Sequence, residues 1–433
     1  MSALSAATFP EAAVRARART GVAHAFPDHR SYGRELFGAP VDGPSGDALD
    51  DSRLVPPVFV PERLEKLVDL GREPLHTDVD LRTRIGGFRS AFPCYVSAFG
   101  STQVASGGLG VAVSRQAGLL GIPLVIGENV VPVNGYGRLE DTAGRGLLGR
   151  ILAYAEAVPD GMGGVVVQQS TEDADAEVWN LVYSDPSALA LLESGRLGFE
   201  LKVGQGAKPG LGGITLLWRD QARDLAEQFA IAPVLGPDAE QVMRFATPGT
   251  FTDEILRQQI RLMRNNFPRA RTWVKLPPGR DIAEAARVAW QAGADAVTVD
   301  GAEGGTGWAP RAALTGLGLP LAECLRRIAV LGSPVDCLLA SGRVWEGVRA
   351  VKCLALGARA TGLGRAALLA ADEDPNRGLV RLVECLAMEM ALLISALGKY
   401  APGALTSDDL WSTTGVPAVP SQPVPGALAG DPR

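Results

Sequence analysis

Two lysines and a glutamine stand close together in this sequence, and four glycines lie in the loop 205–213 beside them. Lys202 is followed by Gln205, Gly206 and Lys208, and three more glycines complete the segment by position 213. The lysines supply positive charge, the glutamine supplies an amide, and glycines expose backbone N–H groups to a ligand. The pattern indicates a loop that binds an anion such as a dicarboxylate or a phosphate. A solvated, flexible loop is the alternative.

A second glycine-rich segment follows an apolar run that ends in Asp300. It contains Gly301, Gly304 and Gly305, and Lys275 stands in the preceding apolar run. A lysine at a strand end can stabilise negative charge on a bound ring, and glycines let the backbone approach a ring or a phosphate closely. The glycines match neither the Rossmann spacing nor the Walker pattern. The segment therefore indicates a binding loop of another kind.

Three further clusters of small residues each follow an apolar run. They are Ser97, Ala98, Phe99 and Gly100; Ser341, Gly342 and Arg343; and Gly364 with Arg365. Small residues let a planar ring lie against the backbone. The last two clusters fit the phosphate site that barrels build between neighbouring loops, to which their arginines could add charge. Ordinary turns and exposed arginines at helix starts are the alternatives.

Eight strand-like apolar runs carry these clusters at or near their ends. The runs cover residues 93–100, 123–128, 163–170, 199–204, 272–277, 296–301, 335–341 and 360–364. Longer Ala- and Leu-rich stretches alternate with them, which is typical of parallel βα units. We therefore predict an α/β protein with a closed (β/α)₈ TIM barrel, whose carboxyl-terminal face gathers the clusters. An open doubly wound sheet is the alternative.

The rest of the chain surrounds this barrel. We expect an N-terminal extension over 1–90 that packs on the barrel, the barrel itself over 91–398, and a C-terminal tail over 399–433 that becomes Pro-rich and extended from 417. The segment 205–271 is longer than a βα loop and one helix require, so it should carry a functional insertion.

Composition and charge favour a protein that binds small molecules. Hydrophobic residues make up 46% and charged residues 21%, and no apolar run is long enough to span a membrane. The net charge is −6 with scattered basic residues, which argues against a nucleic-acid partner. Residues 1–10 lack the pattern of a signal peptide, so we expect a cytoplasmic protein.

The positions of the cysteines and histidines limit the kinds of active site that the protein can have. The five cysteines are widely spaced and offer no metal-binding pattern, so we expect no metal and interpret them as buried, reduced side chains. The three histidines, His24, His29 and His76, all precede the barrel. A histidine base in the active site is therefore disfavoured.

Taken in order, these segments resemble the FMN-binding domain of glutamate synthase and its single-domain relatives. The resemblance covers about 79–370, and its most specific parts are 202–210, 274–276 and 300–307. It implies that FMN binds in the mouth of the barrel. The residues that it assigns to FMN are Ser97, Ala98, Phe99, Gly100, Gln169, Lys275, Gly301, Gly304, Gly305, Ser341, Gly342, Arg343, Gly364 and Arg365.

The resemblance also implies a substrate site on the flavin face. A 2-oxo acid such as 2-oxoglutarate would lie near Glu128, Lys202, Gln205 and Lys208. In the family an imine forms from the oxo acid and ammonia, and reduced FMN delivers hydride to it. The implied catalytic residues are Lys275 beside the ring, Glu128 for a proton, and Lys208 for a substrate carboxylate.

Several positions depart from the family pattern. The sequence starts Met1-Ser2-Ala3, without the N-terminal cysteine of a glutaminase domain, so we expect no ammonia production in this polypeptide. Residues 366–384 contain no cysteine, so we expect no 3Fe-4S cluster. Residues 127–130 read Gly-Glu-Asn-Val in place of Gly-Glu-Gly-Gly, Leu211 replaces a glutamate, and residues 250–253 replace a His-His-Asp segment. The substrate can therefore differ from 2-oxoglutarate.

Two functions of different classes remain open. The first is an FMN-dependent oxidoreductase that acts on the C–N bond of a CH–NH₂ or CH–NH donor in amino acid or 2-oxo acid metabolism. The second is a flavin-binding subunit, similar to that of N-methylglutamate synthase, which needs a partner protein to donate electrons or ammonia. A 2-hydroxy acid oxidase on the same barrel is disfavoured because that chemistry uses a histidine base. The substrate, the electron donor and a homo-oligomeric state stay open.

Overall fold

The computed structural model describes most of the chain. The described residues are 4–6, 9–25, 48–99, 108–127, 146–170, 178–204, 206, 214–220, 222–227, 229–232, 240–245, 251–305, 311–332 and 337–412.

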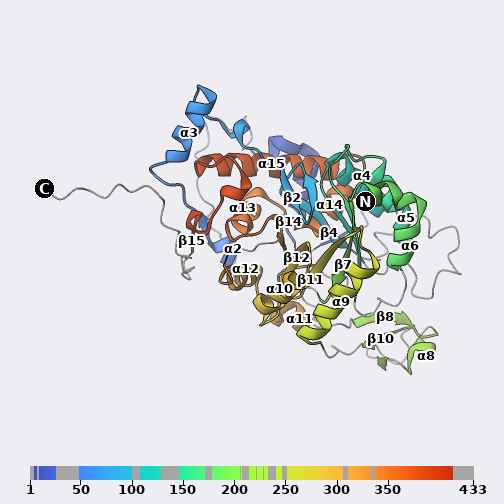
Figure 1. Ribbon diagram of the computed structural model, residues 1–433. Coiled ribbons are helices and arrows are strands. Elements are labelled where there is room, and N and C mark those ends of the chain that lie inside the picture. The colour runs from blue at the N-terminus through green and yellow to red at the C-terminus, as the bar shows by residue number, and fades with distance from the viewer. Residues whose placement is uncertain are drawn as a thin grey trace.

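Eight parallel strands form a closed barrel in the centre of the molecule (Figure 1). In barrel order they are β4 (Cys94–Phe99), β5 (Leu124–Ile126), β6 (Val165–Ser170), β7 (Leu197–Lys202), β11 (Arg271–Leu276), β12 (Ala296–Asp300), β13 (Cys337–Ser341) and β14 (Ala360–Leu363). The barrel closes because β14 pairs with β4. The predicted (β/α)₈ barrel and its eight strands are confirmed, and an open sheet is excluded.

Helices surround the barrel and lie between its strands in the sequence. They are α4 (Gly110–Leu119), α5 (Leu147–Ala155), α6 (Val178–Ser184), α7 (Leu189–Glu193), α9 (Asp253–Asn266), α10 (Ile282–Gln291), α11 (Arg311–Gly316), α12 (Leu321–Ala329) and α13 (Gly347–Ala355), with α14 (Arg365–Glu373) and α15 (Gly378–Ala396) after the last strand. Their buried faces share one large apolar core with the outer face of the barrel wall. This arrangement leaves the carboxyl ends of the strands free for a site.

The sequence of α9 shows why one of these helices starts and packs where it does. The Thr252 hydroxyl accepts a hydrogen bond from the Ile255 N–H at 3.2 Å, so it caps the helix. Leu256, Ile260 and Met263 follow at spacings of three and four residues and are buried. One apolar stripe thus holds the helix against the barrel.

A short hairpin fills the amino-terminal end of the barrel. Strands β2 (Thr83–Ile85) and β3 (Phe88–Ser90) pair around Gly86 and Gly87, whose positive φ angles allow the tight turn. Ile85 and Phe88 join an apolar cluster inside the barrel that is centred on the fully buried Trp273. The Trp273 indole N–H donates to the Gly86 carbonyl at 3.1 Å. The lower half of the barrel is therefore a packed core.

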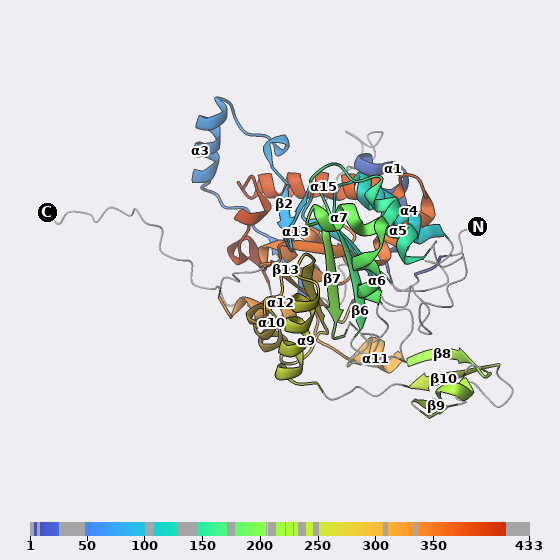
Figure 2. The ribbon, with the colours of Figure 1, turned by 45° about the vertical axis from the view of Figure 1, so that its right-hand side comes forward.

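The segment between β7 and β11 carries structure of its own. Strands β8 (Ile214–Trp218), β9 (Ala230–Ala232) and β10 (Gln241–Phe245) form an antiparallel sheet in the order β8-β10-β9, with α8 (Ala222–Leu225) after β8. In Figure 2 this sheet lies on the side toward which the arrowheads of β6 and β7 point. The insertion expected in the sequence is thus present, and it lies on the carboxyl-terminal side of the barrel.

The N-terminal segments pack on the last helices of the barrel. They comprise α1 (Glu11–Thr20), η1 (Gly21–Ala25), α2 (Ala48–Asp51), β1 (Arg53–Leu54), α3 (Pro61–Leu70) and η3 (His76–Asp78). After α15 come η9 (Pro402–Ala404), η10 (Ser407–Asp409) and β15 (Leu410–Trp411), and β15 pairs with β1. Segments from the two ends of the described chain are therefore joined.

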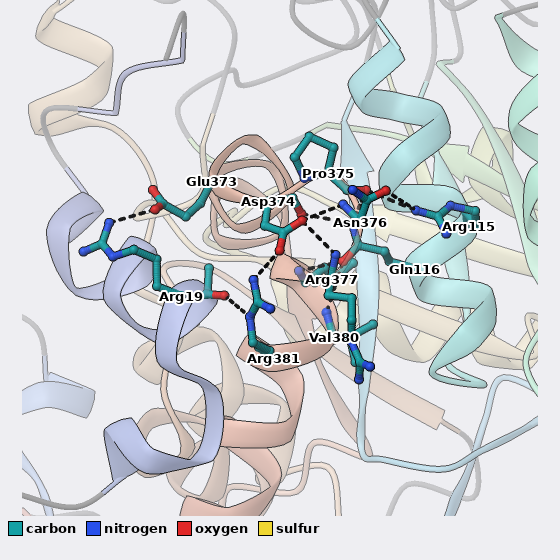
Figure 3. A network of polar contacts seen from close by, with 12 residues as sticks. Arg19, Arg115, Gln116, Glu373, Asp374, Pro375, Asn376, Arg377, Val380 and Arg381 are labelled. Carbon is teal, nitrogen blue, oxygen red and sulfur yellow. Dashed lines mark hydrogen bonds and ion pairs between the residues drawn. The ribbon is translucent and has the colours of Figure 1, made fainter. Parts of the chain in front are cut away.

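A polar network fastens the α14–α15 turn to its neighbours (Figure 3). Arg19 of α1 donates to Glu373 at 2.8 Å, and Arg381 of α15 donates to the Ala18 carbonyl at 2.5 Å. On the other side, the Gln116 side chain of α4 accepts the Leu379 N–H at 2.8 Å. The buried amide satisfies a free donor at the start of α15, so α1, α4 and α15 are held together.

Among the described residues, no helix combines the length and the apolar character needed to cross a membrane.

Candidate functional site

A layer of polar side chains lies inside the barrel, above the apolar cluster around Trp273. Side chains two residues apart on a strand share a face, so residues two positions beyond the apolar layer also point inward. These residues are Ser97, Gln168, Lys275, Thr298 and Ser341. All five are buried. The barrel thus changes from apolar to polar toward its carboxyl-terminal face, where barrel enzymes place their sites.

Lys275 forms an ion pair inside this layer. Its Nζ lies 3.4 Å from Oδ2 of Asp300, and the two side chains are only 6% and 4% exposed. The same carboxylate oxygen accepts the Gly206 N–H at 3.2 Å. The pair therefore links β11 to β12 and to the segment after β7, and it holds a cation at the barrel mouth.

Glu200 is a buried acid in the same layer. Gln168 donates a short hydrogen bond to one of its oxygens, and the Thr298 hydroxyl donates to the other at 3.1 Å. Burial raises the pKa of Glu200, while the nearby Lys275 charge and the two hydrogen bonds oppose that shift. Lys275 thus interacts with both Glu200 and Asp300, and the net charge of the layer depends on whether Glu200 is protonated.

The loop after β12 packs tightly against this ion pair. A Cβ atom at Gly304 would lie 2.6 Å from Oδ1 of Asp300, and one at Gly305 would lie 2.9 Å from Nε of Arg365. Gly206, in the segment after β7, also lies close to this loop, because a Cβ atom there would lie 3.0 Å from the Gly301 carbonyl oxygen. Glycine is required at these positions because the neighbouring chains leave no room for a side chain.

Serine side chains from the ends of β4 and β13 meet inside the barrel, although β14 separates the two strands. The hydroxyls of Ser97 and Ser341 are 3.2 Å apart, and both are buried. The register of β4 with β5 shifts between Val96 and Phe99. Such a bulge redirects the side chains that follow it. Accordingly, Ala98 packs against the interior cluster and Phe99 against the outer core.

The loop after β13 is held by the N-terminal extension. Arg343 has a φ angle of 57°, which is unusual for a residue with a side chain, and its guanidinium donates to Asp50 at 2.9 Å. Asp50 also binds Arg349 at 3.1 Å, and Arg349 donates to the Gly342 carbonyl at 3.1 Å. Asp50 of α2 therefore fixes this loop and balances part of its positive charge.

The loop after β14 leads into the amino terminus of α14. Gly364 caps this helix, and a Cβ atom placed on it would meet no described residue within 4 Å. Arg365 donates to the Glu303 carbonyl at 2.6 Å and lies over the Phe9 ring at 4.5 Å, and burial lowers its pKa. A helix amino terminus that no described side chain covers is suited to an anion.

The structure gathers many of the expected site residues on the same face of the barrel. Lys202 ends β7 and pairs in register with both Ser170 and Lys275. Gln169 is buried on β6 and pairs with Leu201. Gly100, Glu128, Gln205 and Lys208 lie outside the described residues.

Sequence reasoning did not single out Gln168, Glu200 or Thr298. The signal that could have found Glu200 is its spacing of two residues from Lys202 on one strand, which places both on the same face. Gln168 and Thr298 become recognisable only once β6 and β12 are known to face Glu200 across the barrel.

Known proteins share this region. Residues 191–373 match the conserved region in glutamate synthase. A glutamate synthase large subunit-like protein of Rhizobium meliloti is 32% identical over 184 residues, which cover 41% of this chain and 40% of that protein. An archaeal-type glutamate synthase (NADPH) of Dehalococcoides mccartyi is 30% identical over 185 residues, which cover 41% of this chain and 36% of that protein. The chain thus spans about two fifths of the length of these curated relatives.

A solved structure supports the fold. A mutant of an active chimera of (S)-mandelate dehydrogenase superposes with a TM-score of 0.54 at 18% identity, covering 93% of this chain and 99% of that one. At this identity the likeness shows the barrel fold alone. The matched region contains the glycine-rich loops and the buried lysine, so residues 191–373 of this chain are similar to the conserved region in glutamate synthase.

Proposed function

We propose that this chain is an FMN-dependent oxidoreductase that acts on the C–N bond of a CH–NH₂ or CH–NH donor, with an amino acid or 2-oxo acid as substrate. The observation that carries the proposal is the buried Lys275–Asp300 pair at the mouth of the barrel. A fixed cation in a site shielded from water can stabilise developing negative charge strongly.

The described residues fit FMN. No described residue lies within 4 Å of a Cβ atom placed on Gly364 at the amino terminus of α14, so the first N–H groups of this helix can bind a phosphate, as in other barrels. Arg343 and Arg365 add positive charge near that terminus. Ser97 and Ala98 are small residues at the end of β4, where a planar ring can approach the backbone. FMN is a mononucleotide, so its binding requires no dinucleotide-binding domain.

When bound, FMN supplies two-electron chemistry, and the protein supplies orientation and charge. Lys275 holds a positive charge beside the proposed ring position. Asp300 balances and positions Lys275 through the 3.4 Å contact. Lys202 at the end of β7 and Lys208 would bind a substrate carboxylate, with Gln205 beside them. Glu128 would hold the proton exchanged with the substrate nitrogen; its role, and those of Gln205 and Lys208, rest on the sequence resemblance.

The substrate proposal stops at the class of compound. The departures at 127–130, at Leu211 and at 250–253 fall on positions where the family pattern is charged or glycine-rich. Changes of this kind alter the polar contacts that select a substrate. We therefore expect an amino acid or oxo acid that differs from 2-oxoglutarate in its side chain.

A flavin-binding subunit that depends on a partner protein for electrons or ammonia is the second candidate. It is favoured by the name of the Rhizobium meliloti relative, a glutamate synthase large subunit-like protein, because a large subunit acts together with another chain. Turnover by the isolated chain with NADPH or NADH and a free amine distinguishes the two. Activity of the isolated chain supports the enzyme, whereas activity only in the presence of a partner supports the subunit.

The test begins with the purified protein. We expect it to be yellow and to release FMN, not FAD, on denaturation, as identified by chromatography. The flavin absorption spectrum is then titrated with amino acids and 2-oxo acids, and the true substrate class should perturb or reduce the flavin. A colourless protein that takes up no added FMN would refute the proposal.

A further inference from the structure

A pocket lies at the end of the barrel opposite to the polar layer around Lys275. It has a volume of about 890 Å³ and is bounded by the β2–β3 hairpin, the amino ends of three barrel strands and residues 401–403. Cys337 is the first residue of β13 and Arg359 directly precedes β14, so both lie at the amino ends of their strands. Lys275 is the penultimate residue of β11 and lies near the carboxyl end of its strand. The pocket is therefore separate from the proposed flavin site.

Three arginines on this pocket form no ion pair with any residue that the structure describes. Arg84 and Arg89 stand on the hairpin, and Arg359 stands on the barrel wall beside Gly403. All three side chains are exposed. Their positive charges are thus available to a ligand.

The two acids of the pocket already have partners. Asp80 forms a two-point contact with Arg82, its neighbour on the rim. Asp295 lies 3.6 Å from Arg271 and also accepts the backbone N–H of Thr272 at 2.8 Å. Neither carboxylate is therefore directed at the three unpaired arginines, and the pocket keeps an excess of positive charge.

The hairpin places two of these charges directly opposite each other. Arg84 and Arg89 are cross-strand partners in the register of β2 and β3. Like charges in directly opposed positions destabilise a strand pair. The turn at Gly86 and Gly87 fixes this register, so the repulsion is a permanent feature of the fold. An anion between the two guanidinium groups would relieve it.

We propose that this pocket binds a small metabolite that carries at least two anionic groups, either phosphates or carboxylates. The volume lies within the usual range for small-molecule sites, which is about 300–1,000 Å³. Guanidinium groups bind phosphates and carboxylates through paired hydrogen bonds. Three of them around one hollow can engage two anionic groups at once, and a concave site favours a small molecule over a protein surface.

Cys337 provides a built-in reporter for this pocket. It lines the pocket and is partly exposed, whereas Cys94, Cys324, Cys353 and Cys385 are buried. Burial raises the pKa of Cys94 and Cys324 to about 12 and that of Cys385 to about 11, so these thiols stay protonated and slow to react. A neutral thiol reagent applied to the folded protein should therefore label Cys337 first.

The experiment uses FMN-loaded protein and three probes: inorganic pyrophosphate, citrate and ATP without magnesium. Binding is measured by calorimetry, and protection of Cys337 from a neutral maleimide is followed by peptide mass analysis. The double variant Arg84→Gln/Arg89→Gln removes two pocket charges from exposed positions. Arg287→Gln, which changes a partly exposed arginine of α10 that does not line the pocket, is the control.

We expect at least one probe to bind and to slow the labelling of Cys337. The double variant should weaken that binding about tenfold or more, and Arg287→Gln should leave it unchanged. Arg359→Gln should weaken it as well. Failure of all three probes to bind, or equal weakening in the control, would overturn the proposal. The flavin spectrum, read in the same samples, tests the proposed function independently.

Discussion

Replacing Lys275 with methionine removes the cation from the barrel interior and leaves a carboxylate behind. The Nζ to Oδ2 distance of 3.4 Å corresponds to an attraction of about 5 kcal/mol at an effective dielectric constant of 20. The Gly206 N–H stays with Asp300 and compensates only part of the loss. Breaking a buried pair in this way costs about 3–5 kcal/mol of unfolding free energy.

Urea unfolding of the flavin-free protein at pH 7 measures this loss. The double variant Lys275→Met/Asp300→Asn is the control, because asparagine has no charge to bury and its oxygen can still accept the Gly206 N–H. We expect the double variant to recover most of the stability that the single variant loses. Unchanged stability of Lys275→Met, or no recovery in the double variant, would refute the ion-pair reasoning.

The same variant tests the electronic role in FMN-loaded protein. Without the cation, flavin reduction should become harder and the reduction potential should fall, while the phosphate-binding loops are untouched. If both the potential and the turnover rate stay unchanged, Lys275 does not lie at the ring.

Three further predictions concern buried groups. Burial raises the pKa of Glu200, so the unfolding free energy of the wild-type protein falls as the pH rises above the unfolded-state pKa of about 4.3. Glu200→Gln should therefore make the unfolding free energy less dependent on pH between pH 5 and pH 8. An unchanged dependence in urea unfolding would contradict this. Arg150→Met should raise the unfolding free energy by about 1 kcal/mol or more, because the buried guanidinium lies over the Phe99 ring at 4.5 Å and has no hydrogen-bond partner among the residues that the structure describes; a loss of stability would reveal an anionic partner. Gly378→Ala should cost about 1–3 kcal/mol or more, because its Cβ would lie 1.8 Å from the Ala370 carbonyl oxygen, and an unchanged melting temperature would exclude that clash.

The strands and the main loops could be predicted because their signals are local. The apolar runs that end at Asp300 and Ser341 are bounded by glycines, and each became a barrel strand. Lys275 could be assigned to the barrel mouth because it stands near the end of such a run. The rule that barrels collect their sites at the carboxyl ends of strands then brought these loops together.

Contacts between distant segments could not be predicted from these patterns. Asp50 and Arg343 are separated by 293 positions, and nothing in either local sequence indicates the other. Glu200 stands in an otherwise apolar run, and its hydrogen bonds to Gln168 and Thr298 depend on closure of the whole barrel. Charged side chains in barrel interiors are selected by their neighbours across the barrel, which a single strand does not reveal.

The docking of α1 on the end of the barrel has a consequence for biosynthesis. Arg15 binds Glu373, which is 358 positions later in the chain, and Val14 and Ala18 are fully buried in the finished fold. Ribosomes add about 5–20 residues per second, so the helices that cover the apolar face of α1 are made roughly 20–70 s after α1 itself. During that interval it is exposed on the nascent chain, where a chaperone can bind it. During synthesis, α1 can therefore pack into the fold only after α14 and α15 have been made.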